Sequence, residues 1–258
     1  MNSASVLTLA AVLGLAVGSF LNVCIYRLPR QQSIAFPPSR CPRCGRGLSW
    51  FDNIPVLSWI ALRGRCRQCG EPISIQYPIV ELVTAVLFVA VIWLSPIGPL
   101  IVSRLVLGCA LIVLFMIDLE HQILPNVITL PGTAIGLALS LIAPPGIVNA
   151  VIGAVLGAGV LYAIAAGYYL VRKEEGMGMG DVKMLAMIGA FLGWQAVLLT
   201  LILSSFSGAV IGIGILATSR GNMRYALPFG TFLALGAAVA MLGGDALVGW
   251  YLSFFDPR

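Results

Sequence analysis

Long apolar stretches separated by short polar segments are the feature that most constrains how this chain can fold. Of its 258 residues, 59% are hydrophobic and only 10% are charged, and the mean hydropathy is +1.00. A stretch of roughly 20 apolar residues is long enough to cross a bilayer as a helix. The pattern predicts an all-α, polytopic membrane protein with about eight transmembrane helices, not a soluble domain with a large core. We expect these spans near residues 4–25, 79–95, 99–117, 126–143, 147–171, 181–193, 195–217 and 228–251.

The distribution of Lys and Arg predicts the orientation of these spans, because short cytoplasmic loops collect basic residues. Basic residues gather in three regions: between spans one and two, around the connection of spans five and six, and between spans seven and eight (Arg27, Arg30, Arg40, Arg43, Arg46, Arg63, Arg65, Arg67; Arg172, Lys173, Lys183; Arg220, Arg224). With eight spans all three regions fall on one side, which we expect to be cytoplasmic, with both termini outside. This topology accounts for the net charge of +5 without a nucleic-acid partner.

Four cysteines in the polar segment 27–77 form two C-x-x-C pairs, Cys41 with Cys44 and Cys66 with Cys69, each followed by a glycine. This spacing is typical of a four-cysteine zinc site. Paired disulfides are the alternative, and a reducing cytoplasm disfavours them. A redox pair would need only one C-x-x-C. The segment is rich in Pro and Gly and lacks helical periodicity, so we expect a cytoplasmic zinc-ribbon-like loop without helices.

Asp118 and Asp181 are acidic residues at the ends of strongly apolar stretches. Asp118 follows residues 105–117, and Asp181 closes the Gly-Met-Gly-Asp sequence at 178–181. An ionisable group at the edge of a transmembrane segment is costly to bury and is therefore a functional candidate. Both residues are expected at the cytoplasmic face, where two carboxylates could act as the base and the acid of an aspartyl protease. Lys183 is close enough in sequence to help keep Asp181 ionised.

Other interpretations of these residues stay open at this level. Asp181 alone could be a solvated helix N-cap, and Glu81 could be an interfacial carboxylate near a helix N-terminus, although a binding role for it is open. A membrane transporter with intramembrane carboxylates, or a scaffold with a structural zinc loop, is the alternative function. A transporter would more naturally place its carboxylates near the bilayer midplane with access to both sides.

The ordered set of motifs resembles the type IV prepilin peptidase family, the leader peptidases and N-methyltransferases of bacterial pilus and type II secretion systems. The resemblance covers nearly the whole chain and includes residues 19–23 with 27–29, the two C-x-x-C pairs around 52–59, and residues 77–81, 117–119 and 178–181. One departure is Asn126, where many members of that family have an acidic residue.

The resemblance implies a membrane aspartyl endopeptidase of the bacterial inner membrane. Such an enzyme cleaves the basic leader of type IV prepilins or pseudopilins after a glycine, at the cytoplasmic face. It then methylates the new N-terminal residue, usually Phe, from S-adenosylmethionine. By motif, the catalytic pair is Asp118 and Asp181, and the Zn²⁺ ligands are Cys41, Cys44, Cys66 and Cys69. Residues 1–95 would be the methyltransferase-associated part and residues 96–258 the peptidase part, with precursor proteins and membrane lipid as partners.

Overall fold

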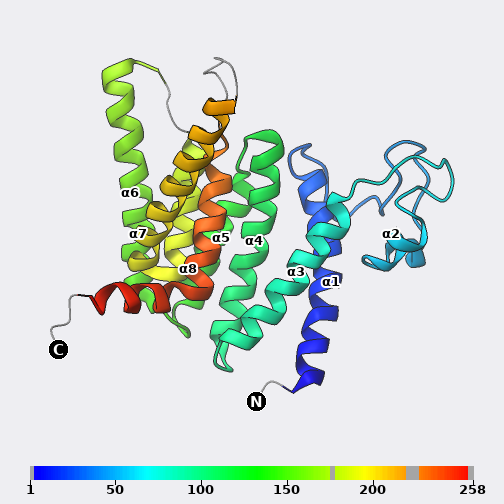
Figure 1. Ribbon diagram of the computed structural model, residues 1–258, viewed down its shortest axis with the longest axis horizontal. Helices are drawn as coiled ribbons and strands as arrows, with labels where there is room; N and C mark the ends of the chain where they lie inside the picture. Colours follow the sequence, from blue (N-terminus) through cyan, green and yellow to red (C-terminus); the bar gives the residue numbers. More distant parts are fainter. Residues whose placement is uncertain (1–2, 175–177, 219–226, 255–258) are drawn as a thin grey trace. The chain divides into compact units, whose positions relative to one another are not determined.

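The computed structural model describes residues 3–174, 178–218 and 227–254, and the regular elements in these ranges are helices (Figure 1). The chain divides into two compact units, Met1–Ile97 and Gly98–Arg258. Two of the basic residues used to predict the orientation, Arg220 and Arg224, lie outside the described residues, as does part of the glycine-rich segment before Gly178.

The N-terminal unit is built on two paired helices, α1 (Ala4–Arg27) and α3 (Gln76–Leu94). Their contact is close because small residues of α1 face α3. A Cβ atom on Gly18 would lie only 2.7 Å from the Cα of Glu81, so a larger residue there would push the helices apart. This packing places the ends of both helices beside the segment that connects them.

The connecting segment 28–75 contains two short helices, η1 (Trp50–Asn53) and α2 (Leu57–Ala61). The expectation of a loop without helices is therefore wrong in this part. The reason is a contact distant in sequence: the Val56 N–H, at the start of α2, donates a 2.7 Å hydrogen bond to the Glu81 carboxylate on α3. Local periodicity cannot reveal such an anchor.

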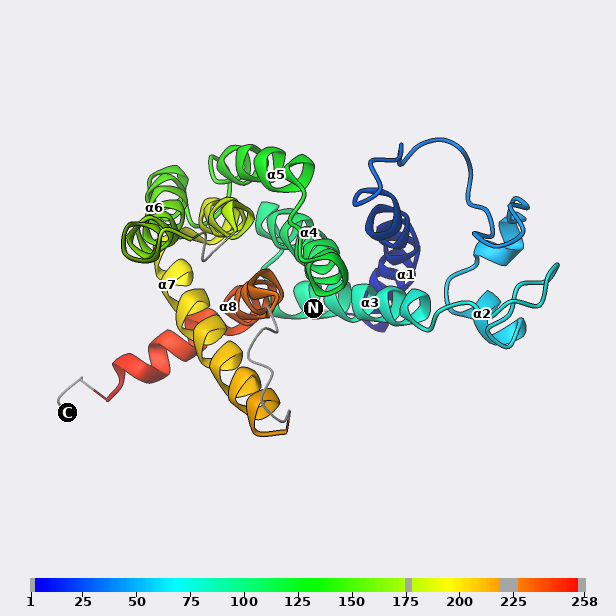
Figure 2. The same cartoon turned by 90° about the horizontal axis from the view of Figure 1, so that it is seen from above.

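The C-terminal unit contains α4 (Pro99–His121), α5 (Asn126–Leu139), α6 (Ile147–Arg172), α7 (Met179–Thr218) and α8 (Phe229–Leu252). The first half of α7 lies among the other four helices (Figure 2). Its side chains Met184, Leu185 and Ile188 have no exposed surface and form the core of the unit. A Cβ on Gly157 of α6 would lie 2.7 Å from the Leu185 carbonyl oxygen, the close approach that a G-x-x-x-G pattern permits.

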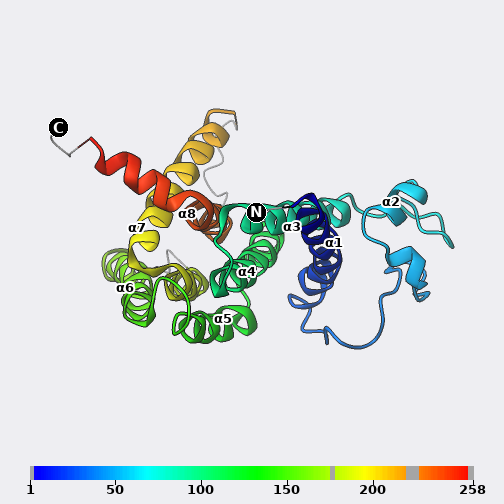
Figure 3. The same ribbon diagram turned by 90° about the horizontal axis from the view of Figure 1, so that it is seen from below.

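Helix α7 is interrupted at Gly193, whose φ of 81° and ψ of 175° are not helical. This is the boundary that the sequence predicts between spans six and seven. Beyond the break the helix leaves the bundle (Figure 3), and its apolar side chains Ile202, Phe206 and Ile213 are exposed. Such a surface suits hydrocarbon better than water.

By length and composition, five helices could cross a membrane: α1, α3, α4, α6 and α7. Two further apolar helices, α5 and residues Phe229–Gly244 of α8, are shorter. The structure thus has an all-α, polytopic architecture. Helix α4 runs four residues past the predicted end of its span, and Gln122 caps it in a left-handed conformation with φ of 54°. Asp118 therefore lies within the last helical turn and not beyond it.

Candidate active site and metal centre

The first candidate carboxylate, Asp118, is held where the end of α4 meets the start of α8. Its side chain is buried, with a residue exposure of 5%. The Thr231 backbone N–H and the Thr231 hydroxyl both donate to Asp118 Oδ2, at 2.6 and 3.0 Å. Thr231 lies in the first turn of α8, where backbone N–H groups have no partner within the helix and favour a negative charge. These two bonds fix the carboxylate in one orientation.

The second candidate, Asp181, lies in the first turn of α7 and is also buried, at 9% exposure. Leu124 packs close to the residues beside both aspartates. A Cβ on Gly180 would lie 2.9 Å from Leu124 Cβ, and a Cβ on Gly230 would lie 2.9 Å from both Leu124 Cδ1 and Asp118 Oδ2. The structure therefore brings the two predicted residues together.

Lys183 does not pair with Asp181, in contrast to the expectation from sequence. Its ammonium group donates a 2.9 Å hydrogen bond to Asn126 Oδ1 at the start of α5, and no ion pair joins it to Asp181 within the described part of the chain. Asn126, the residue that departs from the family pattern, is thus the partner of Lys183. Glu120 is more exposed and lies 3.9 Å from His121, outside the aspartate pair.

The four cysteines of the N-terminal unit form one cluster, with all four Sγ atoms within 4.8 Å of one another. All are free thiols, and Cys41 and Cys66 are buried whereas Cys44 and Cys69 are exposed. The two pairs fold in the same way. In each, the glycine after the second cysteine has a left-handed backbone, with φ of 71° at Gly45 and 69° at Gly70, and donates its N–H to the carbonyl of the first cysteine at 2.9 Å. Four thiolates at this separation suit a tetrahedral metal ion.

Backbone amides tune the acidity of this cluster. Hydrogen bonds from the N–H groups of Cys69 and Gln68 lower the pKa of the Cys66 thiol to about 7, which favours the thiolate that binds metal. At Cys69 the Glu71 N–H acts in the same direction, but desolvation and the neighbouring thiols outweigh it and raise the pKa to about 11. A bound cation would remove this competition, because all four ligands are then thiolates.

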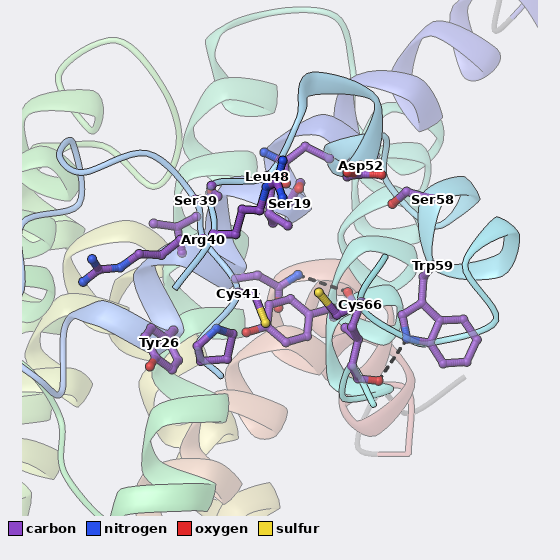
Figure 4. Close-up of a pocket in the computed structure, with 18 of the residues that line it drawn as sticks. Ser19, Tyr26, Ser39, Arg40, Cys41, Leu48, Asp52, Ser58, Trp59 and Cys66 are labelled. Atoms are coloured by element: carbon purple, nitrogen blue, oxygen red, sulfur yellow. Dashed lines mark hydrogen bonds between the residues drawn. The ribbon is translucent and has the colours of Figure 1, made fainter. Parts of the chain in front are cut away.

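A cavity of about 1140 Å³ lies beside the cysteine cluster within the N-terminal unit. Its wall includes Ser19 and Tyr26 of α1, Cys41 and Cys66 of the cluster, and Trp59 of α2 (Figure 4). Its lining also includes Glu81, which lies near the start of α3 and is only 7% exposed. The Val56 and Thr231 bonds are features that sequence reasoning missed, and neither has a local sequence signal.

The fold and these two sites define a polytopic helical membrane protein with a buried pair of carboxylates and a four-cysteine cluster suited to a metal ion. Residues 12–95 match the bacterial peptidase A24 N-terminal domain, and residues 105–213 match the type IV leader peptidase family. The prepilin leader peptidase/N-methyltransferase of Aeromonas hydrophila is 40% identical over 96% of this chain and 94% of its own length. That of Pseudomonas putida is 39% identical over 96% and 94%, respectively.

The relative from Myxococcus xanthus, which carries the same name, is 47% identical over 83% of this chain and 64% of its own length. No solved structure shows significant similarity. At this identity and coverage the chain belongs to the prepilin leader peptidase/N-methyltransferase family.

Proposed function

We propose that this chain cleaves the basic leader of type IV prepilins or pseudopilins after a glycine and then N-methylates the new N-terminal residue, usually Phe. The observation that carries the proposal is the buried pair Asp118 and Asp181, on helix ends that meet beside Leu124, in a chain of this family. The transporter and scaffold alternatives have no comparable support, because both carboxylates lie at helix ends.

Asp118 and Asp181 are proposed as the catalytic residues. One carboxylate takes a proton from the water that attacks the scissile carbonyl, while the protonated partner donates toward the oxyanion and then the leaving amine. The Thr231 N–H and hydroxyl hold Asp118 in place during this exchange. Because coupled carboxylates titrate as a pair, neither role is assigned to one residue.

Eight membrane crossings are proposed from the helices: α1, α3, α4, α5, α6, the two parts of α7 on either side of Gly193, and α8. The break at Gly193 supports two crossings in α7. The basic residues support a cytoplasmic location for residues 28–75 and for both aspartates, in a bacterial inner membrane. Cysteine-accessibility labelling of residues 28–75 from the cytoplasmic side alone is the expected result, and labelling only from the outside would contradict it.

One Zn²⁺ held by Cys41, Cys44, Cys66 and Cys69 is proposed for the N-terminal unit, because four thiols within 4.8 Å form a closed structural donor set. Residues 1–95 are proposed to support methylation, with S-adenosylmethionine as donor, and residues 96–258 to carry the peptidase site. In this division the metal orders the loop, and the aspartates act independently of it.

The proposal is tested by incubating the detergent-solubilised protein with a prepilin precursor and S-adenosylmethionine, and by following leader loss and N-methylation by mass spectrometry. Both modifications are expected, in that order. An intact precursor after incubation with folded, metal-loaded protein would contradict the assignment.

A further inference from the structure

Glu81 differs from the other carboxylates that line the cavity of the N-terminal unit. Glu71 lies 3.6 Å from Arg43, and Asp52 lies 2.8 Å from Arg67, so both are paired with a cation. Glu81 is more buried than Glu71, yet no Lys, Arg or His forms an ion pair with it among the residues described. A buried carboxylate is costly unless it is paired or hydrogen-bonded.

The position of Glu81 is fixed by a strained backbone. Val56, which donates its N–H to Glu81 Oε2 at 2.7 Å, has φ of 60°. A positive φ is a genuine outlier for a β-branched residue and costs free energy, so it persists only where the surroundings impose it. Strain of this kind is concentrated at ligand-binding positions. The carboxylate, the α2 segment and the wall of the cavity are therefore held as one preformed arrangement.

The lining of the cavity combines its carboxylates with an aromatic ring, an amide and five arginines (Arg27, Arg40, Arg43, Arg46, Arg67). The ring of Trp59 is fixed by its 3.2 Å indole hydrogen bond to the Ile73 carbonyl (Figure 4). Asn22, which also lines the cavity, is held by a 3.0 Å bond to the Tyr77 carbonyl. Aromatic faces bind both purine rings and cations. The volume of about 1140 Å³ exceeds what one small ligand requires.

From these observations we propose that this cavity binds S-adenosylmethionine, and that Glu81 is the counter-charge of its sulfonium group. The inference rests on the methyltransferase function proposed above and names the site for its donor. In the transfer, the lone pair of the substrate amine forms the new N–C bond, and the S–CH₃ electron pair returns to sulfur. The amine then carries the positive charge and releases a proton to water.

Because the methyl transfer removes the charge on sulfur, the Glu81 carboxylate should bind the donor and the product with different affinities. The donor is a cationic sulfonium, whereas the product, S-adenosylhomocysteine, is a neutral thioether at the same position. A carboxylate that interacts with the sulfonium charge binds the donor more tightly than the product. It therefore assists the release of the product. A carboxylate that only anchors Val56 has no such preference.

The test is titration calorimetry of the zinc-loaded, full-length protein in detergent with S-adenosylmethionine and, separately, S-adenosylhomocysteine. Glu81→Gln keeps the size and an oxygen acceptor for Val56 but removes the charge. It is expected to weaken binding of the donor by at least about tenfold and of the product by less than about twofold. Glu174→Gln, a matched change in an exposed carboxylate outside this cavity, is expected to alter neither affinity by more than about twofold.

Glu81→Asp provides a second variant because it retains the charge on a shorter side chain, and it is expected to keep the preference for the donor. Equal losses for donor and product in Glu81→Gln would overturn the proposal, as would a wild-type protein that binds neither ligand. Leader cleavage and zinc content are measured on the same samples and are expected to stay unchanged. If the wild-type protein methylates but fails this binding test, the proposed donor site is wrong and the proposed function stands. If it neither cleaves nor methylates, the proposed function is wrong.

Discussion

In the N-terminal unit the cysteine cluster lies on a segment that buries almost no apolar surface, whereas in the C-terminal unit the aspartates lie on helices packed around a dense core. Between residues 28 and 75, Cys41 and Cys66 are the buried hydrophobic side chains, and Trp50, Leu57 and Ile60 are exposed. In α7, by contrast, Met184 and its neighbours are fully buried. From this difference we expect the cysteine site to depend on a bound metal for its order, and the aspartate site to depend on helix packing.

The largest expected effect comes from removing the acid–base capacity of the two aspartates, which should affect the activity of the C-terminal unit and not that of the N-terminal unit. Asp118→Asn and Asp181→Asn keep the size of the side chain but remove its acid–base capacity, so each should reduce leader cleavage by at least about 10²-fold. Zinc content and methylation of an already cleaved substrate should persist, measured by elemental analysis and mass spectrometry. Glu120→Gln and Glu174→Gln serve as controls and should retain substantial cleavage. Near wild-type cleavage in either aspartate variant would overturn the assignment of the catalytic pair.

Removal of the metal tests whether the order of the cysteine segment in the N-terminal unit depends on zinc. The Cys41→Ser, Cys66→Ser double variant should lose its zinc, become sensitive to protease within residues 28–75 and lose methylation, because zinc binding supplies about 10 kcal/mol or more of folding free energy in small zinc sites. The helices of the C-terminal unit should stay protected from protease. Cys109→Ser, outside the cluster, should keep stoichiometric zinc. A zinc-free loop that resists protease as well as the wild type would refute the dependence on metal.

A change in packing tests whether the position of Asp181 in the C-terminal unit depends on the contact between Gly180 and Leu124. Gly180→Ala places a methyl group only 2.9 Å from Leu124 Cβ, so either Leu124 or the backbone that leads into Asp181 must shift. We expect leader cleavage to fall by about tenfold, on the order that small displacements of catalytic groups cause. Adding Leu124→Ala removes the clash and should restore part of the rate. Additive losses in the double variant would show that Leu124 does not transmit the effect.

The smallest expected effect concerns the orientation of Asp118. Thr231→Val removes the hydroxyl donor at 3.0 Å but leaves the backbone donor at 2.6 Å. The loss of one hydrogen bond of about 1 kcal/mol should lower the cleavage rate about fivefold. Thr231→Ser keeps a hydroxyl and should restore the rate measured for the wild type. Equal rates for the valine and serine variants would show that the Thr231 hydroxyl does not contribute to the orientation of Asp118.

The sequence predicted those features that depend on neighbouring residues. Apolar stretches predicted the main helices, and Gly193 marks the boundary expected within α7. The C-x-x-C spacing predicted a cluster that the structure brings within 4.8 Å. Contacts between distant residues were not predictable, because neither partner has a local signal. The Val56 bond to Glu81 and the Lys183 bond to Asn126 are examples, and each changed the interpretation of a charged residue.

The cysteine cluster also has a consequence for the connectivity of the chain. Its outermost members, Cys41 and Cys69, lie within the segment that joins α1 to α3. A cation that ties them together shortens the free path between the two helices by more than half. The entropy cost of closing a loop falls by about 0.6 kcal/mol for each halving of its length. Metal bound outside the bilayer would thus favour the pairing of two helices within it, through chain length alone.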